Sequence, residues 1–206
     1  MATVAFVRHG ITDWNREGRI QGWRDIPLNE AGRRQAFLVA RRLSNEPFDL
    51  IFSSDLKRAA ETAETIGKAL RKTVTLDERL REKKLGRLEG LTVQEIVDRW
   101  GEQWRSLDLG VEDSESIRRR GLAFFVEVTA RFPDQNLIVV SHDSWITETL
   151  RAILGEEIGI GSEGLGNTSV TLLHNDDGRW TCRLLNCTMH LHESTDETEG
   201  RLFYAN

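Results

Sequence analysis

Val4-Ala5-Phe6-Val7-Arg8-His9-Gly10-Ile11-Thr12 is the stretch of sequence that decides the fold. Four consecutive apolar residues are typical of a strand buried on both faces, as in parallel sheets. Gly10 allows the sharp turn that ends the strand. Because open α/β sheets place ligands at the C-terminal ends of their strands, we expect Arg8 and His9 to lie in a site. Arginine matches an anion such as phosphate, and histidine reacts near neutral pH, whereas a chance Arg-His pair is the alternative.

Length and composition limit the class of protein. The chain has 206 residues, 39% of them hydrophobic and 30% charged, which is typical of a soluble globular protein. We expect one domain over residues 1–206. The net charge of −5 argues against nucleic-acid partners and anionic membranes. No secretory signal or membrane span is expected, and two cysteines are too few for a disulfide framework. The expected location is therefore the cytoplasm.

Strand and helix patterns alternate along the chain. This alternation predicts a three-layer α/β/α sandwich around a mostly parallel sheet. A helix should follow Asn29, whose side chain suits an N-cap, and another should begin at Ser114 or Ser116. Further strands are predicted at 48–53, 74–76, 137–142, 169–174 and 180–185, and further helices at 55–70, 92–104 and 143–154.

Two irregular stretches interrupt this alternation. The polar loop over 13–27 is too long for a plain turn, and such ordered loops are usually functional. Residues 83–120 are interpreted as a lid-like insertion that covers the site. Trp100 and Trp104, one helical turn apart, either pack in the core or place one ring against substrate.

Two further residues are candidates for the same site. A second buried strand ends in His142, as the first ends in His9. Arg58 falls in the first turn of a helix, where a cation is unfavourable and an anion is favoured. A bound phosphate would explain Arg58, although a solvated surface arginine is the alternative.

Five ordered motifs together resemble the histidine phosphatase (phosphoglycerate mutase-like) superfamily, over residues 4 to about 174. The motifs are Arg8-His9-Gly10-x-Thr12-x-Trp14-Asn15, Gln21-Gly22-x-x-Asp25-x-Pro27-Leu28-x-x-x-Gly32-x-x-Gln35-Ala36, Ser53-Ser54-Asp55-Leu56-x-Arg58-Ala59-x-x-Thr62-Ala63, Leu80-Arg81-Glu82-x-x-x-Gly86-x-x-Glu89-Gly90 and Val140-Ser141-His142. The resemblance implies a six-stranded, mostly parallel sheet with the site at the strand C-termini. The chain departs from the common family pattern at Ile11 and at Asp143-Ser144, which puts the fine specificity in doubt.

The resemblance also implies a role for each motif residue. His9 would be the nucleophile that forms a phosphohistidine, and it must be neutral to attack. Glu82 would protonate the leaving oxygen and then activate water. The phosphoryl oxygens would be held by Arg8, Arg58, His142 and Asn15, with Thr12, Gln21 and Gly22 also contacting substrate. No metal or other cofactor is expected, because the arginines would supply the electrostatic stabilisation.

Three functions compete on this basis. The favoured one is a metal-independent phosphomonoesterase acting on small-molecule phosphate esters. The alternatives are a cofactor-dependent phosphoglycerate mutase and a catalytically idle binding module of the same fold. The short stretch between Glu82 and His142 favours hydrolysis, because it would leave the phosphohistidine open to water. The sequence does not name the substrate, and a final strand or exposed helix could pair in a homodimer.

Other notable residues have plainer interpretations. The spacing of Cys182, Cys187, His190 and His192 matches no standard metal site. The run at 118–120 is three arginines on a helix, which predicts a solvated face. Asp143 is expected to cap the following helix, with tuning of His142 or substrate contact as alternatives.

Overall fold

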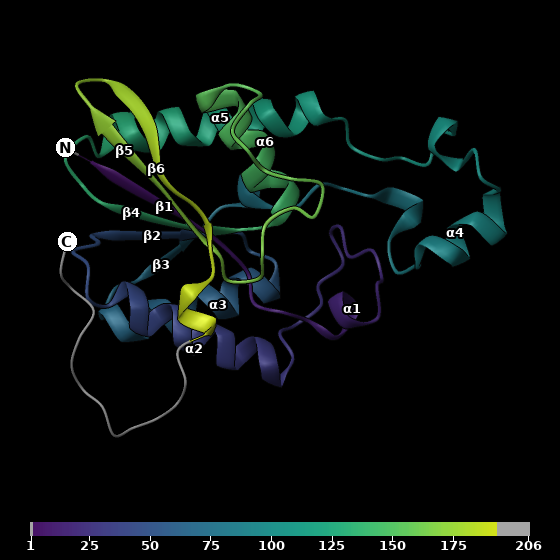
Figure 1. Cartoon of the computed structure of the whole chain (residues 1–206), viewed down its shortest axis with the longest axis horizontal. Helices are drawn as coiled ribbons and strands as arrows, with labels where there is room; N and C mark the ends of the chain where they lie inside the picture. Colours follow the sequence, from purple (N-terminus) through teal and green to yellow (C-terminus); the bar gives the residue numbers. More distant parts are fainter. Residues whose placement is uncertain (1, 193–206) are drawn as a thin grey trace.

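The six strands form one sheet in the order β3-β2-β4-β1-β5-β6 (Figure 1). The computed structural model describes residues 2–192. Strands β1 to β4 are mutually parallel, and β5 and β6 are antiparallel additions at one edge. The predicted six-stranded, mostly parallel sheet is therefore confirmed. The strands are β1 Thr3–Arg8, β2 Leu50–Ser53, β3 Val74–Leu76, β4 Leu137–Ser141, β5 Val170–Asp176 and β6 Arg179–Cys187.

Helices cover both faces of the sheet, as predicted for three layers. Helices α2 (Glu30–Leu43) and α3 (Lys57–Leu70) lie on one face. Helices α5 (Ser114–Arg131) and α6 (Asp143–Leu154) lie on the other (Figure 1). Within residues 2–192, no helix is long and apolar enough to cross a membrane.

The central strand β1 contributes to both hydrophobic cores. Val4 and Phe6 pack among residues of α5 and α6, whereas Ala5 and Val7 pack among residues of α2 and α3. Successive side chains of a strand point to opposite faces, so burial of all four requires helices on both sides. The continuous apolar run therefore fixes β1 at the centre of the sheet.

Helix capping follows the sequence in one case and departs from it in another. The side chain of Asn29 accepts a hydrogen bond from the N–H of Gly32 at 2.8 Å, which confirms the predicted start of α2. The cap of α5 is Asp113, which accepts from the N–H of Ser116 at 2.7 Å. The prediction of a serine cap was wrong, because the carboxylate one residue before Ser114 serves the same N–H groups.

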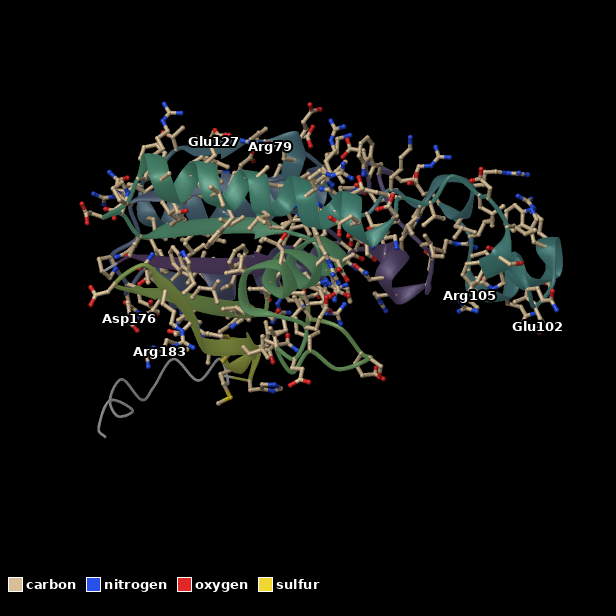
Figure 2. The ribbon with its side chains drawn as sticks, turned by 90° about the horizontal axis from the view of Figure 1, so that it is seen from above. Arg79, Glu102, Arg105, Glu127, Asp176 and Arg183 are labelled. Atoms are coloured by element: carbon tan, nitrogen blue, oxygen red, sulfur yellow. The ribbon has the colours of Figure 1, made fainter. Side chains whose placement is uncertain are left out.

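The insertion stands away from the sheet and has its own small core. Its helix α4 (Val93–Trp100) lies beyond the short helix α1 (Asp13–Arg16) in Figure 1. The helix is shorter than predicted, because Gly101 with φ of 78° ends it and Trp104 falls in a 3₁₀ turn. Both tryptophans pack against a cluster of three buried residues, Leu88, Ile96 and Leu109. Figure 2 shows the far end of the insertion, where Glu102 and Arg105 lie.

Candidate active site

His9 lies directly after β1 and is held by main-chain contacts. Its N–H donates to the carbonyl of Ser141 at 3.0 Å, which ties it to β4. Its ring Nδ1 lies 2.7 Å from the carbonyl oxygen of Gly10. A carbonyl only accepts hydrogen bonds, so Nδ1 carries the proton and Nε2 keeps its lone pair. The side chain is 2% exposed, and burial followed by the charges of Arg58 and Arg8 lowers its pKa well below 6.5. His9 is therefore neutral at pH 7.

Arg58 places a buried cation beside this lone pair. Its Nε donates to Nε2 of His9 at 3.3 Å, and its two Nη groups donate to the carbonyls of Arg24 and Gly22 at 2.9 and 2.8 Å. These three partners are neutral. The side chain is fully buried, and desolvation lowers the pKa of Arg58 to about 10, so the guanidinium remains charged at pH 7. A buried cation with neutral partners is poised to bind an anion.

His142 faces His9 across the site. The two rings are 5.1 Å apart between centroids, and His142 is fully buried at the start of α6. Its Nε2 lies 2.9 Å from the hydroxyl of Ser54, while its buried Nδ1 has no protein partner. Burial, then the charge of Arg58, lowers the pKa of His142 well below 6.5. The site thus combines two neutral histidines with fixed cations.

Arg8, at the end of β1, adds a second guanidinium. Its Nη1 donates to the carbonyl of Leu165, and its Nε is buried without a protein partner. The loop around Leu165 is thereby attached to the site, and part of the guanidinium is left for a ligand.

Thr12 and Asn15 form the start of α1 rather than two independent contacts. They make a capping box, in which the Thr12 hydroxyl accepts from the N–H of Asn15 and the Asn15 oxygen accepts from the N–H of Thr12, both at 3.1 Å. The amide nitrogen of Asn15 is left to donate to a ligand. The fully buried Thr12 fixes Asn15, so its own contact with substrate stays a prediction.

Gly22 contacts Arg58, and Gln21 is the residue before Gly22. Gly22 adopts φ of 49° and contributes its carbonyl to the Arg58 fork. Gln21 is 9% exposed, and its buried Oε1 has no protein partner. The structure thus brings Gly22 to Arg58, and direct substrate contact by either residue stays a prediction.

Glu82 lies on a segment that is neither helix nor strand, after the 3₁₀ turn Glu78–Leu80. Its Oε1 accepts from the N–H of Lys83 at 2.7 Å. Its carbonyl accepts from the indole Nε1 of Trp23 at 2.7 Å. The charge of Glu82 acts on Arg58 by raising the pKa of that arginine against the effect of burial.

Sequence reasoning missed several supporting residues. Ser54, which contacts His142, was visible in the Ser53-Ser54-Asp55 motif, so its position next to a strand end was the available signal. Asn167 donates through Nδ2 to the carbonyl of His9 at 3.0 Å. Trp23 holds the carbonyl of Glu82. Asn167 and Trp23 lie in loops whose placement depends on tertiary structure, and no periodic pattern marks them.

Two interpretations of charged residues need correction. Asp143 does not cap α6 with its side chain but accepts from the N–H of Leu165 at 2.8 Å, so it anchors the glycine-rich loop. Of the arginine run, only Arg119 is exposed as predicted. Arg118 pairs with the buried Glu148 at 2.6 Å, and Arg120 is largely buried against main-chain carbonyls.

The late cysteines and histidines have structural contacts. Within residues 2–192, no group of three or more His, Cys, Asp or Glu side chains is arranged to hold a metal ion. His190 contacts the Thr168 hydroxyl at 3.1 Å, and both His190 and Cys187 contact Arg42.

A polar cleft of about 200 Å³ adjoins the site. It is bounded by the residues that follow Glu82 and His142 and by the loop at 160–164. Its lining includes two cations and two carboxylates, Lys83, Arg151, Asp143 and Glu148. A leaving group with polar substituents would fit such a lining.

Comparison with known proteins gives consistent results. The family model described as histidine phosphatase superfamily (branch 1) matches residues 4–188. Phosphoserine phosphatase 1 of Hydrogenobacter thermophilus is 35% identical over 202 residues, covering 94% of this chain and 96% of the relative. A protein of Yersinia pestis named probable phosphoglycerate mutase is 47% identical over 105 residues, covering 51% of this chain and 48% of its own. The structure of a mycobacterial glucosyl-3-phosphoglycerate phosphatase with VO3 has a TM-score of 0.80 at 32% identity, covering 90% of this chain and 99% of that one.

Proposed function

Because the chain belongs to the histidine phosphatase superfamily and is a phosphoric monoester hydrolase, we propose that Nε2 of His9 attacks the phosphorus of a small phosphate monoester. The observation that carries this proposal is the ring orientation of His9. The Gly10 carbonyl holds the proton on Nδ1, and the unprotonated Nε2 lies beside Arg58. A neutral imidazole whose unprotonated Nε2 lies next to a buried cation places a nucleophile beside an anion site.

The reaction then proceeds in two balanced steps. In the first, a bond forms between Nε2 and phosphorus, the ester P–O bond breaks, and Glu82 gives its proton to the leaving oxygen. The hydrogen bond to the Gly10 carbonyl stabilises the positive charge that the ring gains. In the second step, water loses a proton to Glu82 and attacks phosphorus. The P–N bond breaks, which releases inorganic phosphate and restores His9.

The fixed cations stabilise charge on the phosphoryl oxygens in both steps. Arg58 and the buried part of Arg8 donate to these oxygens, and the Asn15 amide adds a further donor. If the Ser54 hydroxyl donates to Nε2 of His142, the proton of that ring is on Nδ1, where no protein group accepts it. His142 then donates to phosphate without carrying a charge. These donors do the electrostatic work without a metal ion.

The substrate class is small phosphate esters, with the leaving group in the adjoining cleft. Two relatives are named phosphatases of phosphoserine and of glucosyl-3-phosphoglycerate, and both compounds carry a carboxylate near the ester. Lys83 lines the cleft directly after Glu82, so its ammonium group favours an alcohol of this kind. A cytoplasmic location, expected from the sequence, stays a prediction, and so does a homodimer, which the sequence allows but does not demand.

The test is phosphate release in the presence of EDTA. Wild type should hydrolyse p-nitrophenyl phosphate and a panel of phosphoserine, phosphoglycerates and sugar phosphates. His9→Ala should lose at least about 10⁴-fold of the rate. His174→Ala is the matched control, because His174 pairs with Thr3 at the opposite end of β1. Rapid acid quench of labelled substrate would destroy a phosphohistidine, whereas alkaline quench should preserve it on wild type.

Other outcomes would contradict the proposal. Activity retained by His9→Ala would remove the nucleophile assignment. Phosphoryl transfer to phosphoglycerate much faster than to water would favour the mutase, the second candidate, which the mutase-named relative supports over half of the chain. No release from any ester and no transfer would leave a binding module.

A further inference from the structure

Arg120 of α5 binds the main chain on both sides of Glu82. Its Nη1 donates to the carbonyls of Arg79 and Arg81 at 2.8 and 2.5 Å, and its Nη2 donates to the carbonyl of Glu82 at 3.0 Å. The carbonyls belong to a segment, residues 79–84, without strand pairing. The hydrogen bonds from this one side chain therefore replace the strand-to-strand hydrogen bonds that the segment lacks.

Glu112 completes the arrangement from the opposite side of the guanidinium. Its two oxygens accept from Nε and Nη2 of Arg120 at 3.0 and 3.1 Å. One of them also accepts from the N–H of Lys84 at 3.0 Å, and the N–H of Glu112 donates to the carbonyl of Lys84 at 2.8 Å. We call these two residues the Arg120–Glu112 clamp. It holds the segment on both sides of Glu82.

The clamp is itself anchored. Ile117 and Phe124, on either side of Arg120 along α5, are fully buried in the main core. Arg79, at the start of the segment, pairs with Glu127 of the same helix at 2.6 Å, and the two side chains lie together in Figure 2. The segment is thus held by two residues of α5, Arg120 and Glu127, and by Glu112, which lies just before that helix.

Main-chain position controls the carboxyl group of Glu82 directly. That carboxyl accepts from the N–H of the next residue, Lys83, so its oxygen is fixed relative to the main chain that carries it. A shift of about 1 Å in a reacting group costs about 10²-fold in rate. Any loosening of the segment would therefore displace the Glu82 carboxyl group together with the main chain.

Arginine suits this role better than lysine. The guanidinium has five N–H donors in a planar fork, and here the fork serves three carbonyls and one carboxylate. The side chain is only 17% exposed, and that of Glu112 is 13% exposed. A surface ion pair would need neither this burial nor these main-chain partners.

We propose that Arg120, held by Glu112, is a positioning residue that keeps the Glu82 carboxyl in line with the leaving oxygen. This inference rests on the proposed function, in which Glu82 protonates that oxygen. Its consequence is specific to the first step, because there only esters whose alcohol needs a proton to leave depend on the acid, whereas the second step is the same for all esters.

The experiment compares leaving groups of different basicity in Arg120→Met and wild type. The kcat/KM for an alkyl phosphate, which reports the first step, should fall by about 10²-fold, whereas kcat/KM for 2,4-dinitrophenyl phosphate, whose phenolate leaves unprotonated, should change less than about threefold. Arg119→Met is the matched control, because its exposed side chain lies on the same helix. It should leave both rates unchanged. Arg120→Lys should show the same selectivity with a smaller loss.

A double variant separates positioning from a general structural role. On a Glu82→Gln background, Arg120→Met should cost little more on the alkyl ester, because both changes remove the same proton transfer. An equal loss on all esters, or a further full loss in the double variant, would overturn the proposal. If Arg120→Met fails to fold, Arg120→Lys and Glu112→Gln carry the same comparison. If Glu82→Gln alone shows no leaving-group selectivity, then the acid assignment in the proposed function is wrong. If Glu82→Gln shows it and the clamp variants do not, only this inference fails.

Discussion

The two halves of the site are built in different ways. The phosphate side, defined by His9, Arg58 and His142, comes from strand ends and the first turns of helices. The acid side, residues 79–84 with Glu82, has no strand partner and depends on hydrogen bonds that Trp23 and Arg120 donate and Glu112 accepts. In the proposed mechanism, the half that binds the group common to all substrates is therefore built on the ends of the sheet. The half proposed to meet the variable alcohol is held by side chains.

This difference predicts different responses to substitution. Changes on the phosphate side remove a charge that the fold has buried, so activity and stability should move in opposite directions. Changes on the acid side loosen a segment without opening the main core, so the effect should depend on the substrate. Three experiments test this contrast, and the largest expected effect comes first.

Arg58→Met should separate activity from stability on the phosphate side. We expect a loss of about 10³-fold in kcat/KM, because a fixed donor to the phosphoryl oxygens is removed. We expect no fall in Tm, since a fully buried cation with neutral partners is replaced by an apolar chain of similar length. Added inorganic phosphate should raise the Tm of wild type but not of the variant. Thermal melts and steady-state rates measure both effects.

The control for Arg58→Met is Lys57→Met. Lys57 is the preceding residue of α3, and its side chain is 63% exposed, so neither activity nor Tm should change. A large fall in Tm for Arg58→Met with activity retained would reverse the contrast, because Arg58 would then serve the fold and not the site.

Stability should fall at acid pH because of the two buried histidines. Burial and the charge of Arg58 lower the pKa of both His9 and His142 well below 6.5. Below pH 6.5 the unfolded chain takes up protons that the folded chain does not. Each histidine then lowers the free energy of unfolding by up to about 1.4 kcal/mol per pH unit. Denaturant unfolding at a series of pH values measures this effect. The free energy of unfolding should fall more steeply between pH 7 and pH 5 in wild type than in the double variant His9→Asn/His142→Gln. Equal slopes would show that the phosphate side does not bury neutral histidines.

Trp23→Phe should produce the smallest effect and act on the acid side. The phenyl ring keeps much of the stacking under Arg81, whose guanidinium lies 4.9 Å from the indole, but it loses the Nε1 donor to Glu82. One lost hydrogen bond corresponds to about a tenfold fall in kcat on an alkyl phosphate. Trp104→Phe, in the insertion cluster, is the matched control and should leave that rate unchanged. A uniform loss on all esters would show that Trp23 shapes the site as a whole.

The same division decides what could be predicted from the sequence. The apolar runs of β1 and β4 are local signals, and the residues directly after them, His9 and His142, were placed correctly beside each other. Arg58 was identified as a site residue from its place in the first turn of a helix. The motif also identified Glu82, although nothing local shows how its segment is held.

The failures concern contacts between distant parts of the chain. Arg120 was predicted to be solvated because three consecutive arginines have the pattern of a polar helix face, whereas its acceptors are carbonyls 38 to 41 residues earlier. Main-chain carbonyls are present at every residue, so sequence carries no signal for which ones a side chain reaches. The prediction that Asp143 caps α6 was wrong for the same reason, because its partner Leu165 lies in a loop without periodicity.

The parallel pairing of β1 with β4 joins Val4 to Leu137 and Arg8 to Ser141. During synthesis on the ribosome, the apolar run at 4–7 therefore leaves the exit tunnel well before its neighbour. At ordinary elongation rates this delay is on the order of ten seconds. Throughout that interval the apolar run is exposed, so a chaperone can bind it. A nascent chain arrested before β4 would carry His9, the proposed nucleophile, but could not bury it, so the site is complete only when the second half of the polypeptide has emerged.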